Sequence, residues 1–209
     1  AIINQNTSNL FVDGRYTFQA KEQIDKDMIS LMHLSNFYEE LKKNFEQNKC
    51  VALDPMLHSI EEVNKIIKLA DENETKLYFT KPNLIDELWI DKPEREYSVI
   101  FNHPINYAGI DASNKVDQFV KELKNNNLDS YFLSSLDSIA WLLNIRADDI
   151  LHTPLAFSYL FISVENKPIL YLSIEKLNTD LKNRLSNFLK LQPIEKIDNI
   201  FKNLTKKLK

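Results

Sequence analysis

The chain has 209 residues, a net charge of −4 and a 44% hydrophobic share, an ordinary composition for a globular protein of one or two domains. Its 26 basic residues against 30 acidic ones lack the excess that nucleic-acid binding requires, so that function is excluded. Two glycines, Gly14 and Gly109, are too few for glycine-rich phosphate loops, and no apolar run approaches the ~20 residues of a membrane span.

The first half of the sequence alternates short strand-like runs with helical periods, which predicts a layered α/β domain. Asp13 is expected to accept hydrogen bonds from the start of the first helix, with Gly14 freeing the backbone at the bend. Asn36 is expected to cap the second helix, and Ser59 with Glu62 has the spacing of a capping box for a third. Strands are predicted at residues 1–5, 9–13, 28–34, 50–53 and 76–80.

Two prolines, Pro93 and Pro104, mark a change of composition near the middle of the chain. Because each proline interrupts regular structure, we predict a linker at 93–106 between a first domain, 1–92, and a second, 107–209. The α/β pattern restarts after the linker, so two domains of about equal size are expected. The predicted strands of the second domain lie at 130–134, 157–164 and 168–173, and its predicted helices carry apolar faces within 116–123, 136–143, 181–189 and 197–208.

The stretch SLDSIAWLLNIRADD, which begins at Ser135, combines a helix suited to burial with a charged end. Asn144 is expected to stop this helix in the left-handed conformation. The following loop, 146–152, is at the end of a rigid element, which is a common place for functional groups. One interpretation of Arg146 is that it pairs with a neighbouring acid, and another is that it binds a ligand. The neighbouring acids are Asp148 and Asp149, and the predicted buried face is Leu136, Ile139, Ala140 and Leu143.

Residues suited to catalysis or metal binding are scattered through the sequence. No His-x-x-x-His or Cys-x-x-Cys pair occurs. Cys50 lies in a strand predicted to be buried, where its thiol would be inert. The acids of the pair Asp148-Asp149 are expected to be solvated. Spacing alone therefore predicts neither an active site nor a metal site. The four histidines, which are far apart, are His33, His58, His103 and His152.

Five stretches occur in an order that resembles Xaa-Pro aminopeptidases. The resemblance is to the N-terminal, creatinase-like part of the large three-domain form, aminopeptidase P, and it covers nearly the whole chain. It implies an α/β fold of two creatinase N-terminal-like domains, each a mixed β-sheet flanked by helices. The stretches are FVDGRYTFQA, VALDPMLHSI, NLIDELWIDKPE, YAGIDASNKV and LDSIAWLLNIRADDILHTPLAFSYLFI.

In the family that the chain resembles, a further domain carries the catalysis. It binds two divalent metals, usually manganese, and releases the N-terminal residue that precedes a proline. That domain is missing from this sequence, as is the glycine-rich segment that in the family comes just before the strand matching Ala1–Asn4. The resemblance therefore implies a non-catalytic portion of a hydrolase, inactive alone and binding no metal itself.

The resemblance also implies partners and roles for this portion. It is expected to restrict access to the catalytic cleft and to support dimerisation, with the catalytic domain of the same polypeptide and proline-containing peptides as partners. A single cysteine and an N-terminus unlike a secretory signal favour a cytoplasmic location. The alternative is a stand-alone binding or assembly module of the same fold without catalysis, and a third hypothesis is an independent hydrolase.

Two residues of the charged loop are the candidate substrate-binding residues under this resemblance. Arg146 and His152 are expected to face the catalytic cleft and help to bind the peptide. Ala147 replaces a glycine that is usual in the family, and Thr153 replaces an asparagine. If that glycine has a positive φ, alanine would be strained by ~1 kcal/mol or more, and otherwise the position has no special conformation.

Overall fold

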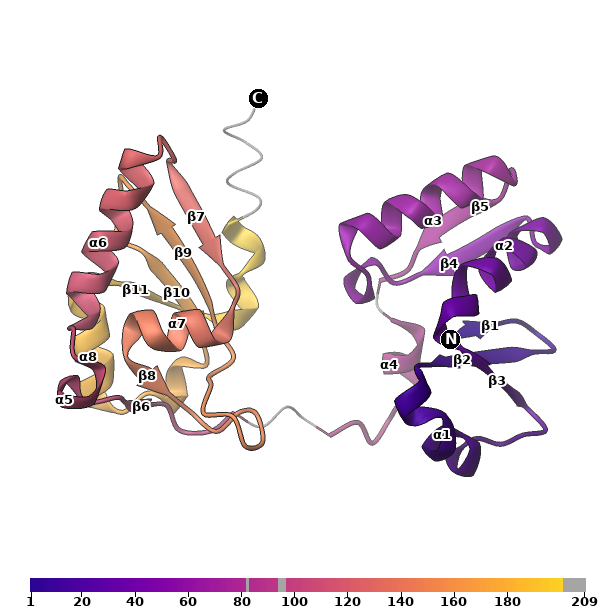
Figure 1. Ribbon diagram of the computed structural model, residues 1–209, viewed down its shortest axis with the longest axis horizontal. Coiled ribbons are helices and arrows are strands. Elements are labelled where there is room, and N and C mark those ends of the chain that lie inside the picture. Colours follow the sequence, from indigo (N-terminus) through magenta and orange to yellow (C-terminus); the bar gives the residue numbers. More distant parts are fainter. Residues whose placement is uncertain (82, 94–96, 201–209) are drawn as a thin grey trace. The chain divides into compact units, whose positions relative to one another are not determined.

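The computed structural model describes residues 1–81, 83–93 and 97–200 (Figure 1). Its internal contacts divide the chain into two compact units, Ala1–Pro93 and Glu94–Lys209. Part of the predicted linker, residues 94–96, and most of the last predicted helix, beyond Ile200, lie outside the described residues. Within the described part of the chain, no helix has the length and apolar character needed to cross a bilayer.

The first unit holds two small groups of strands. A three-stranded sheet has the order β1-β2-β3, with β1 antiparallel to β2 and β2 parallel to β3, and a second sheet pairs β4 with β5 in parallel. The strands are β1 (Ile2–Ile3), β2 (Ser8–Val12), β3 (Ile29–His33), β4 (Cys50–Leu53) and β5 (Lys76–Phe79), and the helices are α1 (Thr17–Gln23), α2 (Phe37–Gln47), α3 (Ile60–Glu72) and α4 (Leu84–Leu88).

The core of the first unit is small because few side chains meet between its helices and strands. Leu41 and Phe45 of α2 pack against Ile66 and Ala70 of α3, and half-buried side chains of β4 and β5 cover them. Cys50 was predicted to be buried, but it is exposed. The reason is that β4 packs only one face on the core, so its side chains alternate between half-buried and exposed positions.

The helix starts of the first unit test the predicted caps. The capping box is confirmed, since the Ser59 hydroxyl accepts from Glu62 N at 3.2 Å and the Glu62 carboxylate accepts from Ser59 N at 2.8 Å. Asp13 likewise accepts from Arg15 N at 2.9 Å. The Asn36 cap was wrong, because this side chain makes no capping hydrogen bond. Gly14 does not have a positive φ, so the bend does not require glycine there.

The second unit is built on a four-stranded mixed sheet of order β11-β10-β9-β7, in which β10 and β11 are parallel and the other pairs are antiparallel. A two-stranded sheet pairs β6 with β8. The strands are β6 (Phe101–Asn102), β7 (Ser130–Leu133), β8 (Ile145–Arg146), β9 (Tyr159–Ser163), β10 (Ile169–Leu172) and β11 (Lys190–Pro193), and the helices are α5 (Ile105–Ala108), α6 (Ala112–Asn125), α7 (Leu136–Leu143) and α8 (Thr179–Phe188).

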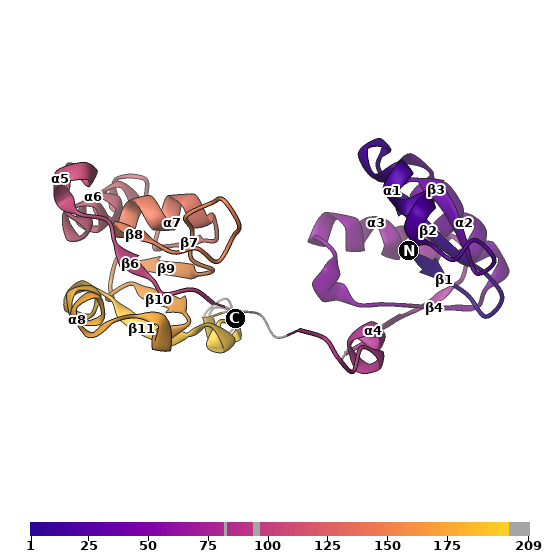
Figure 2. The ribbon, with the colours of Figure 1, turned by 90° about the horizontal axis from the view of Figure 1, so that it is seen from below.

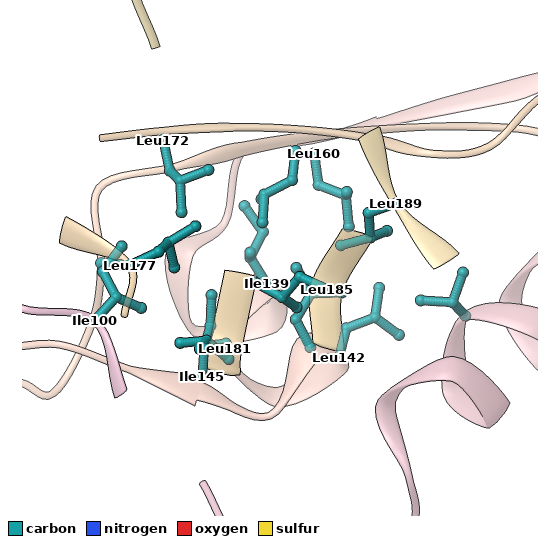
Figure 3. Close-up of a cluster of buried hydrophobic side chains, with 14 of the residues drawn as sticks. Ile100, Ile139, Leu142, Ile145, Leu160, Leu172, Leu177, Leu181, Leu185 and Leu189 are labelled. Atoms are coloured by element: carbon teal, nitrogen blue, oxygen red, sulfur yellow. The ribbon is translucent and has the colours of Figure 1, made fainter. Parts of the chain in front are cut away.

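One continuous apolar core holds the second unit together. Helices α6 and α7 lie side by side (Figure 1 and Figure 2), and together with α8 they pack on the sheet. Figure 3 shows the meeting side chains, with Ile139 of α7 and Leu185 of α8 close to each other and near Leu160 of β9. These three side chains are fully buried, so this unit has a larger core than the first.

The fold class is confirmed as α/β, with mixed sheets and flanking helices. Two details differ from the prediction. β11 was missed because its sequence, KLQP, lacks the alternation of apolar residues that is typical of a strand. It is a strand because it pairs with β10. The stretch Phe101–Asn102 lies inside the predicted linker at 93–106, yet β6 pairs with β8 and Ile100 N donates to Lys176 O. The predicted linker therefore includes a short strand that pairs within the second unit.

Candidate functional site

The carboxyl end of α7 is the structural centre of the candidate site. As predicted, Asn144 ends the helix in the left-handed conformation, with φ 50° and ψ 50°. Its side chain is buried and donates from Nδ2 to the carbonyl oxygen of Ile110 at 2.9 Å. Its own carbonyl oxygen accepts from His103 N at 2.8 Å. Asn144 thus joins the end of α7 to the segments before α6 and after β6.

Three cationic side chains, Lys115, Arg146 and Arg184, donate hydrogen bonds to this end of α7. Lys115 is only 4% exposed, and its Nζ donates to Trp141 O at 2.7 Å and to Asn144 Oδ1 at 2.8 Å. Burial lowers the pKa of Lys115, and the nearby charge of Arg146 acts in the same direction. The last carbonyls of a helix carry partial negative charge, which explains why cations gather here.

Arg184 of α8 reaches the same helix end from another direction. Its Nη2 donates to Leu143 O at 3.1 Å and to Asn144 O at 3.4 Å, and its buried Nε has no hydrogen-bond partner. Burial lowers the pKa of Arg184, whereas the charge of Asp111 opposes this shift. Arg184 therefore fixes α8 against the end of α7 at the cost of a partly unsatisfied guanidinium.

Arg146 was expected either to pair with an acid or to bind a ligand. In the structure its Nη1 donates to Ala140 O and Ile145 O, both at 2.8 Å, and within residues 97–200 no ion pair joins it to Asp148 or Asp149. Pairing with an acid was therefore the wrong interpretation. Arg146 is half-buried and caps the carboxyl end of the helix that precedes it. Because β8 includes Arg146, the loop begins after it.

Asp149 organises the loop that follows Arg146. Its Oδ1 accepts from the backbone N–H of Ser98 at 2.6 Å and from the Ser98 hydroxyl at 2.9 Å, and its Oδ2 accepts from Phe157 N at 2.8 Å. The prediction of a solvated Asp148-Asp149 pair was wrong for Asp149, which is half-buried, whereas Asp148 is exposed. A carboxylate that accepts several N–H and O–H bonds is a structural fixture of the loop.

The other loop positions singled out from the sequence are Ala147 and His152. Ala147 is fully buried and its φ is not positive, so the alanine fits without strain. His152 is exposed and has a φ of 60°, in the left-handed region. Within residues 97–200 no hydrogen bond joins His152, which lies in the loop, to Arg146 at the end of β8.

Sequence reasoning missed Lys115, Arg184 and Ser98. Lys115 stands beside apolar Val116 in an amphipathic helix, where a lysine is normally solvent-exposed. Its partners are 26 and 29 residues away in sequence, and no local pattern reports contacts of that range. The end of α7 could have indicated that donors lie nearby, because the last carbonyls of a helix have no hydrogen-bond donor within the helix.

A metal centre finds no support among the described side chains. Over residues 1–81, 83–93 and 97–200, no three or more His, Cys, Asp or Glu side chains gather as a metal site would require. A dinuclear centre needs several such ligands around each pair of ions. These residues therefore do not fit a dinuclear metal centre, and we assign no catalytic step to a metal on them.

Comparison with known families places these elements in context. The model of the Creatinase/Prolidase N-terminal domain matches residues 91–209, which is more than half of the chain. The chain belongs to the creatinase/prolidase N-terminal domain family. Its match to that family includes α6, α7, the three cations and the loop with His152.

Longer relatives of this creatinase-family chain are Xaa-Pro aminopeptidases. It is 33% identical over 202 residues to the probable Xaa-Pro aminopeptidase P of Talaromyces marneffei and 30% identical over 202 residues to that of Paracoccidioides brasiliensis. The matches cover 94% of the chain but 31% and 33% of these relatives. The chain thus spans about a third of the length of the curated relatives that it matches.

A solved structure supports the same relationship. The X-prolyl aminopeptidase of Caenorhabditis elegans, described as a cytosolic enzyme with a di-nuclear active site, superposes with a TM-score of 0.85 at 26% identity. The match covers 98% of this chain and 34% of that enzyme's chain. Both units of the creatinase-family chain therefore have counterparts in that enzyme.

Proposed function

We propose that this chain is the non-catalytic N-terminal portion of a metal-dependent Xaa-Pro aminopeptidase, which releases the N-terminal residue preceding a proline. The observation that carries the proposal is the match to named Xaa-Pro aminopeptidases along nearly the whole chain but only about a third of their length. Two divalent ions, manganese in our proposal, then belong to a catalytic domain of the same polypeptide outside residues 1–209. The proposed location is the cytoplasm, in keeping with the description of the nematode enzyme.

In this proposal the chain controls access to the catalytic cleft and supports dimerisation of the enzyme. The proposed domains are a first at 1–92 and a second at 107–209, joined by a linker at 93–106. Arg146 and His152 are the proposed substrate-binding residues. Arg146 suits this role because Nη1 anchors its guanidinium on α7, and a fixed fork of donors can then hold a peptide carbonyl or carboxylate.

The full-length gene product tests the proposed function directly. With added manganese it is expected to release the first residue from a short peptide with proline in second position, and to leave unchanged a matched peptide with alanine there. Release is measured by quantifying the free amino acid over time. A reading frame that stops at Lys209, or a longer product that binds other proteins but cleaves neither peptide, would favour a binding or assembly module instead.

A substitution of Arg146 tests the proposed substrate contact. In the full-length enzyme, Arg146→Ala is expected to lower kcat/KM by ~10-fold or more, the scale of one lost charge-assisted hydrogen bond. It should also lower stability by about 1–2 kcal/mol, because Ala140 O and Ile145 O each lose the hydrogen bond from Nη1.

Arg184→Met is the matched control, since Arg184 also donates to the end of α7 but has no proposed contact with substrate. Peptide kinetics and denaturant unfolding are measured on both variants. If both lose stability and only Arg146→Ala loses kcat/KM, the contact is supported. An equal fall of kcat/KM in both variants would show that Arg146 acts only by holding the helix end.

A further inference from the structure

An aromatic pocket of about 540 Å³ opens on the second unit, where α6, β7 and α7 meet (Figure 1). Its volume lies within the ~300–1,000 Å³ that is typical of ligand sites. Each of the three elements contributes one ring: Phe119 from α6, Tyr131 from β7 and Trp141 from α7. Neither Arg146 nor His152 is among the residues that line it, so the pocket is separate from the proposed substrate contacts.

The rings of this pocket present aromatic surface to the solvent. Tyr131 and Trp141 are 44% and 59% exposed. Phe119 packs against the core and meets Tyr131 edge to face, with ring centroids 5.5 Å apart. The Trp141 ring already accepts one cation, since the Lys115 Nζ lies 4.2 Å from its centroid. Lys115 is buried and is not among the residues that line the pocket, so it does not occupy the pocket itself.

Asp137 gives the pocket a negative charge. Its Oδ1 accepts from the Ser135 hydroxyl and from Ser138 N, the latter at 2.8 Å. The hydrogen bond from Ser135, and then the one from Ser138 N, lower the pKa of Asp137, so the carboxylate is ionised at neutral pH. A carboxylate has about four acceptor positions, which leaves room for further donors. Because the faces of aromatic rings are also negative, the pocket favours a cation and disfavours an anion.

A guanidinium group fits this combination of rings and charge best. It is planar and stacks on aromatic rings, and its fork of donors can bind one carboxylate with two hydrogen bonds. A lysine ammonium supplies the charge without the planar stacking or the fork, so it should bind more weakly. An apolar side chain would cover the Asp137 carboxylate without offering it a donor, which is unfavourable.

We propose that the pocket formed by Phe119, Tyr131 and Trp141 binds an arginine side chain of a peptide, with Asp137 as its counter-ion. Contacts with a few rings and one exposed carboxylate are weak individually, so a short peptide should bind with a dissociation constant on the order of 1 mM. The proposal adds a peptide-binding site to the second unit and does not depend on aminopeptidase activity.

Fluorescence of Trp141 tests the pocket in residues 1–209 with Trp89→Phe, which leaves Trp141 as the single tryptophan of this chain. The probe is acetyl-Ala-Arg-Ala-amide, and matched peptides carry lysine or glutamine in place of the arginine. The arginine peptide is expected to change the emission in a saturable way, and the glutamine peptide to bind at least ~10-fold more weakly. Higher salt should weaken binding of the arginine peptide, because Asp137 is exposed. Equal binding of the arginine and glutamine peptides would overturn the proposal.

Two substitutions test the assigned residues. Asp137→Asn removes the charge at nearly constant shape, and Tyr131→Thr removes one ring while keeping a side chain suited to a strand. Each is expected to weaken binding of the arginine peptide by ~5-fold or more. Asp117→Asn is the matched control, because Asp117 is an exposed acid of α6 that does not line the pocket, and it should leave the affinity unchanged.

Guanidinium unfolding of each variant separates a loss of binding from a loss of folding, and Asp137→Asn decides alone if Tyr131→Thr does not fold. Unchanged affinity in Asp137→Asn, or an equal fall in Asp117→Asn, would count against the site. Saturation-transfer NMR with the arginine peptide then compares residues 1–209 with the full-length gene product, and both are expected to bind it. Binding to residues 1–209 but not to the full-length protein would also overturn the proposal, because another segment of the polypeptide would then cover the pocket.

Discussion

Purified residues 1–209 are expected to release no amino acid from an Xaa-Pro peptide, with or without added manganese. A two-metal hydrolytic site needs a set of carboxylate and histidine ligands that converge on the ions. Over residues 1–81, 83–93 and 97–200 no such set of three or more side chains occurs. The step that activates water for attack on the peptide bond therefore has no ligand set on these residues.

The assay compares the purified chain with the full-length gene product at equal concentration, across the fractions of a size-exclusion column. Free amino acid is measured in each fraction after long incubation, and a chelator is added in a parallel series. Activity that follows the peak of residues 1–209 through a second purification and disappears with chelator would contradict the prediction. It would mean that the chain assembles a metal site from residues that lie apart in the structure.

The sequence predicted the end of α7 correctly but not its neighbours. Asn144 could be recognised as a left-handed stop because this conformation is a local property of the residue and its place after an apolar helix. The partner of Arg146 could not be recognised, because carbonyls and nearby acids compete for a guanidinium and the choice depends on where the backbone turns. Asp149 was unavailable as a partner, since Ser98 and Phe157 already occupy its oxygens.

The first unit shows the same limit for a strand. Cys50–Leu53 was correctly predicted as a strand from its apolar residues, yet its burial was wrong. A short apolar strand is buried on both faces only when other elements cover both, and the sequence of the strand does not report this.

Lys115→Met is expected to lower the free energy of unfolding of the second unit by about 2–4 kcal/mol. Methionine keeps an unbranched apolar stem but removes the donors that reach Trp141 O and Asn144 Oδ1. A buried acceptor left without its donor costs about 1–3 kcal/mol, and here two acceptors lose the same partner. The Asn144 side chain is 3% exposed, so water does not readily replace the lost bond.

The pH dependence of this effect follows from the lowered pKa of Lys115. Burial lowers it from the usual 10.5, so between the folded-state value and 10.5 the unfolded chain binds more protons than the folded one. The contribution of Lys115 to stability therefore rises as pH rises through that window. Lys115→Met lacks this group, so its deficit relative to the natural chain is expected to be larger at alkaline pH than at neutral pH.

Tryptophan fluorescence during guanidinium unfolding measures the second unit alone when Trp89 of the first unit is replaced by phenylalanine. Trp141 then reports, and its ring centroid lies 4.2 Å from the Lys115 Nζ. Lys121→Met is the matched control, because Lys121 is an exposed lysine of the same helix and its loss should change stability by no more than ~0.5 kcal/mol. If Lys115→Met is as stable as Lys121→Met, the carbonyls at the end of α7 are satisfied by water. The bonds from Arg146 to Ala140 O and Ile145 O could then also be replaced by water. They would no longer be a reason to expect a fixed orientation of the Arg146 guanidinium.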